Sequence, residues 1–142
     1  MNKEESSQSP KPETDQADGR PCVLLVEDDR SVRRYLEVTL QRSGYRVVTA
    51  EDGLEAMKLA MSSAIDIVVT DAIMPNLSGQ QLAAFLRQNP KLAKLPIVLL
   101  TGQENKAAAN IDAASIDAFL YKPVKADELK ACVERLVKKP RA

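Results

Sequence analysis

The sequence predicts an α/β fold: a doubly wound, five-stranded parallel sheet with helices on both faces. The first observation behind this prediction is that short apolar runs alternate five times with segments of helical character between residues 21 and 139. The second is that the first, third and fourth runs are almost entirely apolar, as strands covered on both faces must be. In such sheets, ligands bind outside the carboxyl ends of the strands, where the strand order switches direction.

The five strands are predicted from runs of aliphatic, β-branched and aromatic residues. Each run is four to six residues long. In chain order, the runs are "CVLLVE" (22–27), "YRVVTA" (45–50), "IDIVVT" (65–70), "PIVLLT" (96–101) and "AFLY" (118–121).

The helices between these strands are predicted from capping residues and apolar periodicity. Asp28 or Asp29 can cap the first helix, which should end at Gly44. The second helix opens at Asp52-Gly53, and Ser78 can cap the third. The fourth is an Ala-rich segment over about 104–114. The last helix carries a complete apolar stripe, formed by Leu129, Cys132, Val133, Leu136 and Val137.

Composition excludes several classes of function. The 20 basic and 20 acidic residues balance, so no basic excess points to nucleic acid or to a membrane surface. No apolar stretch reaches the ~20 residues of a spanning helix, and we expect a cytoplasmic protein. The chain has no histidine, which excludes Ser-His-Asp and Cys-His catalysis. Residues 1–20 are polar and are expected to form a disordered N-terminal tail, and 140–142 are the C-terminal end.

Reactive side chains stand at the predicted carboxyl ends of four strands, and we expect them to converge on one edge of the sheet. Clustered carboxylates repel one another unless a hard cation such as Mg²⁺ joins them. A carboxylate can also attack phosphorus, and an amine and a hydroxyl can stabilise the transferred phosphoryl group. These residues are Glu27, Asp28, Asp29, Asp71, Thr101 and Lys122.

Four sequence pieces, in order, resemble the receiver domain of bacterial two-component response regulators. They are "VLLVEDDRSVRR", "DIVVTDAIMPNLSG", "PIVLLTG" and "FLYKPV", and the resemblance covers about residues 21–139, the expected receiver domain. It implies a flavodoxin-like, receiver-type sheet. It also implies that Asp71 is the phosphoacceptor and that Thr101 and Lys122 contact the phosphoryl group.

The resemblance further implies a magnesium site and a conformational switch. Glu27, Asp28, Asp71 and the backbone carbonyl of Ile73 match the family's Mg²⁺ ligands, whereas Asp29 is interpreted as a helix cap. Thr101 and Phe119 match the residues that switch position on phosphorylation. The Lys122-Pro123 peptide bond resembles one that is cis in this family.

The implied partners are a sensor histidine kinase or a histidine phosphotransfer protein, and a downstream protein. We expect a stand-alone receiver, without a DNA-binding or catalytic domain after residue 139, that is a monomer or weak dimer. It would not be an enzyme beyond its own Mg²⁺-dependent phosphorylation and dephosphorylation. One alternative is a degenerate receiver that only binds proteins. Another is a haloacid dehalogenase-type phosphatase, whose second Asp, two residues after the nucleophile, is here replaced by Ile73.

Overall fold

The computed structural model describes residues 19–102 and 113–138. Its sheet has the order β2-β1-β3-β4-β5, and every pairing is parallel. The doubly wound parallel fold predicted from the sequence is therefore confirmed. The strands are β1 (Cys22–Val26), β2 (Arg46–Ala50), β3 (Ile67–Asp71), β4 (Ile97–Thr101) and β5 (Ala118–Tyr121).

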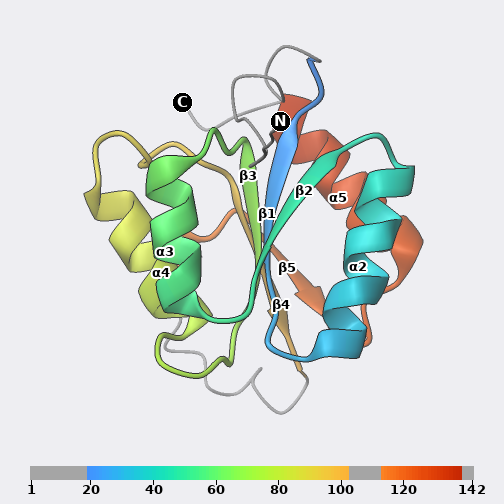
Figure 1. Cartoon of the computed structure of the whole chain (residues 1–142), viewed down its shortest axis with the longest axis horizontal. Helices are drawn as coiled ribbons and strands as arrows, with labels where there is room; N and C mark the ends of the chain where they lie inside the picture. Colours follow the sequence, from blue (N-terminus) through green and yellow to red (C-terminus); the bar gives the residue numbers. More distant parts are fainter. Residues whose placement is uncertain (1–18, 103–112, 139–142) are drawn as a thin grey trace, which may run out of the picture.

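The helices cover the sheet on both faces, as Figure 1 shows. Helices α3 and α4 lie on one side and α2 and α5 on the other. Their bounds are α2 (Arg30–Arg42), α3 (Gly53–Ser62), α4 (Gly79–Gln88) and α5 (Ala126–Lys138). The Ala-rich helix predicted at 104–114 lies mostly outside the described residues, and the described part at Ala113–Ser115 is a short 3₁₀ helix, η3.

Burial follows the strand order. All residues of β1, β3 and β4 are buried, because these strands lie inside the sheet and are covered on both faces. Edge strands β2 and β5 are mostly half-buried. β3 extends one residue further than predicted: Asp71 pairs with Leu100, and the Ala72 N–H donates to the Leu100 carbonyl at 2.8 Å. This pairing fixes the backbone at the carboxyl end of β3.

Side-chain caps start three helices at the carboxyl edge of the sheet. Asp29 Oδ1 accepts from the Val32 N–H at 2.9 Å, which settles the choice between Asp28 and Asp29 in favour of Asp29. Asp52 caps α3, and Ser78 forms a reciprocal capping box with Gln81 at the start of α4. Gly44, which ends α2, has a φ of 98°, a conformation that favours glycine. No helix among the described residues is long and apolar enough to span a membrane.

Candidate functional site

Three carboxylates gather where the strand order switches, between β1 and β3. One oxygen from each of Glu27, Asp28 and Asp71 lies within 4.8 Å of the other two. Glu27 and Asp71 are buried, whereas Asp28 is exposed. The fold explains the convergence, because adjacent parallel strands end at the same edge and β1 and β3 are neighbours. Three like charges this close favour a bound cation, and oxygen ligands suit Mg²⁺.

Lys122 brings a positive charge into the same cluster from the end of β5. Its Nζ lies 2.9 Å from Asp71 Oδ2 and 3.4 Å from Glu27 Oε1. Its backbone N–H donates to the Thr101 carbonyl at 2.8 Å, and the following bond to Pro123 is cis. Burial lowers the pKa of Lys122, but the hydrogen bond and charge of Asp71, together with Glu27, outweigh burial and raise it. The amine therefore carries its charge at neutral pH.

Only one of the two carboxylate oxygens of Glu27 accepts a hydrogen bond from the described residues. Its Oε2 accepts a hydrogen bond from the Asp29 N–H at 3.1 Å. Its Oε1 is buried and has no hydrogen-bond partner among the described residues, although it forms a 3.4 Å ion pair with Lys122 Nζ. Burial, and then the charge of Asp71, raise the pKa of Glu27 to about 7, although the Asp29 N–H and Lys122 act in the opposite direction. A buried carboxylate oxygen without a donor fits a cation site.

Gly79 and Ile73 shape the surroundings of Asp71. A Cβ on Gly79 would collide with the Asp71 carbonyl oxygen and the Leu99 side chain, so glycine lets α4 start directly against β3. Ile73, two residues after Asp71, is 59% exposed. Its side chain therefore stands in solvent beside the cluster rather than in the core.

Thr101 and Phe119 lie on the same face of adjacent strands. Leu99 pairs with Phe119 and Thr101 with Tyr121 across β4 and β5, and alternate residues of a strand share a face. Thr101 is buried, and its Oγ1 donates to the Gly102 carbonyl at 3.3 Å. Phe119 is half-buried against the core beneath α3 and α4. The structure thus places the predicted hydroxyl and aromatic residues on one face of the sheet, two positions apart in register.

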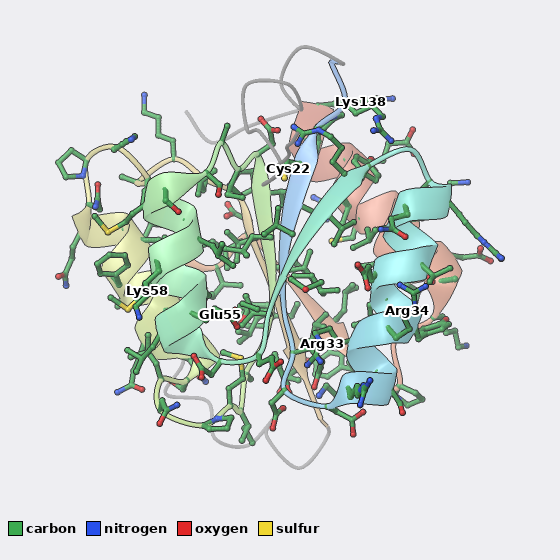
Figure 2. The ribbon with its side chains drawn as sticks, in the orientation of Figure 1. Cys22, Arg33, Arg34, Glu55, Lys58 and Lys138 are labelled. Atoms are coloured by element: carbon green, nitrogen blue, oxygen red, sulfur yellow. The ribbon has the colours of Figure 1, made fainter. Side chains whose placement is uncertain are left out.

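Arg33 is a supporting residue that the sequence did not single out. Its Nη1 donates to the Glu27 carbonyl at 2.8 Å, and this pins the turn between β1 and α2. Arg33 lies on the sheet side of α2, whereas Arg34 points outward (Figure 2). Its position one helical turn after the Asp29 cap could have indicated this contact, because a helical side chain points back towards the N-terminus and so brings the Arg33 guanidinium over the end of β1.

A groove of about 470 Å³ opens beside Lys122, between α2 and the segment that follows β5. Val32, Tyr35 and Val124 give it an apolar lining, and the Tyr35 side chain is largely exposed. The acidic cluster therefore adjoins an apolar surface as well as solvent.

The sheet order and the acids at the carboxyl ends of β1 and β3 define this molecule as a flavodoxin-like α/β protein. Its acidic site lies between β1 and β3, where the strand order switches direction. Comparison with known families then identifies it further. The family described as "Response regulator receiver domain" matches residues 23–134. The chain belongs to this family of two-component system proteins, as its resemblance predicted.

Curated relatives agree with this assignment. The response regulator MprA of Mycobacterium sp. (strain KMS) is 37% identical over 119 residues, which are 82% of this chain and 50% of that protein. The sensor histidine kinase TmoS of Ectopseudomonas mendocina is 34% identical over 119 residues, which are 83% of this chain and 12% of that protein. The chain thus spans about half the length of the first relative and a small part of the second.

Solved structures show the same fold. A putative response regulator from Chloroflexus aurantiacus J-10-fl aligns with a TM-score of 0.80 and 30% identity, over 84% of this chain and 99% of that one. The receiver domain of the sensor histidine kinase PA1611 from Pseudomonas aeruginosa PAO1 aligns with a TM-score of 0.78 and 26% identity, over 84% and 99% of the two chains. That structure has a magnesium ion coordinated in its active site cleft.

Proposed function

We propose that this chain is a phosphoacceptor in a two-component phosphorelay. Asp71 receives a phosphoryl group from a phosphohistidine of a sensor histidine kinase or a histidine phosphotransfer protein, and the phosphorylated form changes its binding to a downstream protein. The observation that carries the proposal is the position of the Asp71 carboxylate, which is buried beside two further acids and 2.9 Å from the Lys122 amine. Receiver domains in histidine kinases and response regulators among the relatives support this class of donor.

The proposed chemistry is a phosphoryl transfer onto a side-chain oxygen. An Asp71 carboxylate oxygen attacks phosphorus in line, the O–P bond forms, and the P–N bond to the donor imidazole breaks. The imidazole leaves with the electron pair and takes up a proton. The Lys122 ammonium lies where it can offset the negative charge on the phosphoryl oxygens. Hydrolysis of the aspartyl phosphate later regenerates the Asp71 carboxylate and releases inorganic phosphate, so the chain acts only on its own phosphoryl group.

A divalent cation fits the same site. Mg²⁺ would be held by Glu27, Asp28, Asp71 and the Ile73 carbonyl. The buried Oε1 of Glu27, which accepts no hydrogen bond from the described residues, favours such an ion. Bound Mg²⁺ would supply further neutralisation of charge on the phosphoryl oxygens. The phosphoacceptor step of the proposal is tested by incubation with acetyl phosphate and Mg²⁺, followed by intact-mass measurement. One added phosphoryl group supports it, and an unmodified mass overturns it.

Thr101 is expected to couple phosphorylation to the conformation of Phe119. Among the described residues, the Thr101 hydroxyl donates one hydrogen bond, at 3.3 Å to the carbonyl of its neighbour Gly102, and a phosphoryl group offers it a stronger, charged acceptor. The chain has no tryptophan, so Phe119→Trp introduces a unique fluorescent reporter. In that background, acetyl phosphate should change the emission of the introduced indole, and Thr101→Ala should remove most of the change while leaving the mass adduct.

Thr101→Ser is the matched control, because it keeps the hydroxyl. It should retain the emission change. If Thr101→Ala responds as fully as its parent, the hydroxyl is not the coupling group.

Ile73 is expected to prolong the life of the phosphorylated state. Its exposed, branched side chain has no hydrogen-bonding group with which to orient the water that attacks the phosphorus. Ile73→Asn should therefore lose phosphate roughly threefold to tenfold faster, because a polar side chain can position that water. Phosphate loss should be timed by intact mass at equal Mg²⁺. Met61→Gln, an exposed apolar-to-polar change on α3, should decay like the parent, and a decay of Ile73→Asn no faster than the parent would refute the role of Ile73.

A further inference from the structure

The loop between β3 and α4 (residues 72–78) is attached to the rest of the fold at both ends. At its start, the Ala72 N–H donates to the Leu100 carbonyl at 2.8 Å, and the Gly79 N–H donates to the Ala72 carbonyl at 3.0 Å. Towards its end, Asn76 Nδ2 donates to Asp52 Oδ2 at 3.2 Å. Ile73 lies in the short span between these attachments.

Asn76 combines two properties at its position. Its φ is 72°, a left-handed conformation that asparagine tolerates better than most side chains. Its amide also makes the hydrogen bond to Asp52, which lies 24 residues away in the sequence. Glycine would accept the same backbone conformation but could not donate this hydrogen bond.

The acceptor is itself fixed by the N-terminus of α3. Asp52 Oδ1 accepts from the Glu55 N–H at 2.8 Å, so one carboxylate both caps α3 and holds Asn76. Glu55, labelled in Figure 2, reaches back to accept from the Glu51 N–H at 2.8 Å. The loop is thus tied to an ordered helix terminus.

Close packing adds to this attachment. A Cβ on Gly53 would lie 2.5 Å from both the Cβ and the carbonyl oxygen of Leu77. Glycine at this position therefore lets the loop lie directly against the start of α3. Leu77 also packs against the core beneath α3 and α4.

We propose that the N-terminus of α3 positions the Ile73 carbonyl for a cation, through the hydrogen bond from Asn76 to Asp52. Asp52 and Asn76 are then positioning residues for the acidic cluster of Glu27, Asp28 and Asp71. The inference rests on the proposed function, in which this carbonyl is a Mg²⁺ ligand. Groups behind a metal ligand orient it, and their mutation commonly weakens metal binding.

Two single variants and their combination test the inference. Asn76→Gly keeps the left-handed backbone accessible and removes the donor. Asp52→Ser keeps a residue that can cap α3 and removes the acceptor. Each should bind Mg²⁺ roughly threefold to tenfold more weakly than the parent, while the unfolding temperature without metal changes little. The double variant should be no weaker than either single variant, because both remove the same hydrogen bond.

Hydrogen exchange in the metal-free protein gives a readout independent of Mg²⁺. The amides of Ile73, Met74 and Leu77 should exchange faster in Asn76→Gly than in the parent. Asn89→Gly, at the C-terminal cap of α4, is the matched control and should leave both the loop exchange and the Mg²⁺ affinity unchanged.

The outcomes separate this inference from the proposed function. A parent that takes up no Mg²⁺ overturns the proposed function, and the inference falls with it. A parent that binds Mg²⁺, with variants that bind equally well, overturns only the positioning role and leaves the proposed function standing. Additive losses in the double variant would also overturn it, because they would show that the two side chains act separately.

Discussion

Asp71→Ala is expected to abolish phosphorylation completely. Asp71 is the carboxylate that lies 2.9 Å from the Lys122 amine and shares a cluster with Glu27 and Asp28. Removing its carboxylate removes the attacking oxygen. Glu27, the other buried acid of the cluster, lies farther from the Lys122 amine, at 3.4 Å. Intact-mass measurement after incubation with acetyl phosphate and Mg²⁺ should show one phosphoryl adduct in the parent and none in Asp71→Ala.

The control for this experiment is a carboxylate outside the cluster. Asp127 is exposed in the first turn of α5, and Asp127→Ala should be phosphorylated like the parent. Circular dichroism of Asp71→Ala should confirm that the variant is folded. An undiminished adduct in folded Asp71→Ala would show that another residue accepts the phosphoryl group.

Much of the fold could be predicted because its determinants are local in the sequence. The almost entirely apolar runs of β1, β3 and β4 identified buried strands, and the structure buries all residues of these strands. Asp52 and Ser78 were predicted to begin helices, and each side chain accepts a hydrogen bond from a backbone N–H three residues later. Such caps depend on a few adjacent residues, so the sequence alone is sufficient.

The order of the strands and the convergence of their ends required a further step. Alternation of strands and helices predicts a parallel sheet, but it does not state which strands are neighbours. The structure places β1 beside β3, and this pairing puts Glu27 and Asp28 next to Asp71. The position of these acids at strand ends predicted that they share one edge of the sheet, and the family resemblance added the flavodoxin-like, receiver-type arrangement of that sheet.

Contacts between distant side chains were beyond sequence reasoning. The hydrogen bond from Asn76 to Asp52 depends on how closely two loops approach, and that distance is set by Gly53 against Leu77. Similarly, the contact of Arg33 with the Glu27 carbonyl depends on the angle at which α2 leaves β1. These angles and distances arise from packing of the whole sheet, and no short motif encodes them.

Asp28→Ala is expected to weaken Mg²⁺ binding by roughly tenfold or more, since few protein ligands are available and each carboxylate contributes charge. Asp28 is exposed, so its removal should leave the fold intact. Titration of the free protein with Mg²⁺, followed through the amide signals of residues 27, 28 and 71, measures the affinity. Asp29→Asn is the matched control, because it neutralises the adjacent acid while keeping a residue that caps α2. Equal affinities for Asp28→Ala and the parent would place the cation elsewhere.

The same titration should depend on pH through Glu27. Burial and the charge of Asp71 raise its pKa from 4.5 to about 7, so the metal-free native state holds a proton that the unfolded chain has lost between these values. The stability of the metal-free protein should therefore fall as pH rises through this window, and Glu27→Gln should remove that fall. In the proposed site Mg²⁺ would bind the ionised carboxylate, so its affinity for the parent should decrease from about pH 8 to about pH 6 as protons compete for Glu27. An affinity that stays constant over this range would show that Glu27 does not face the ion, because a ligand with this pKa cannot bind Mg²⁺ without releasing its proton.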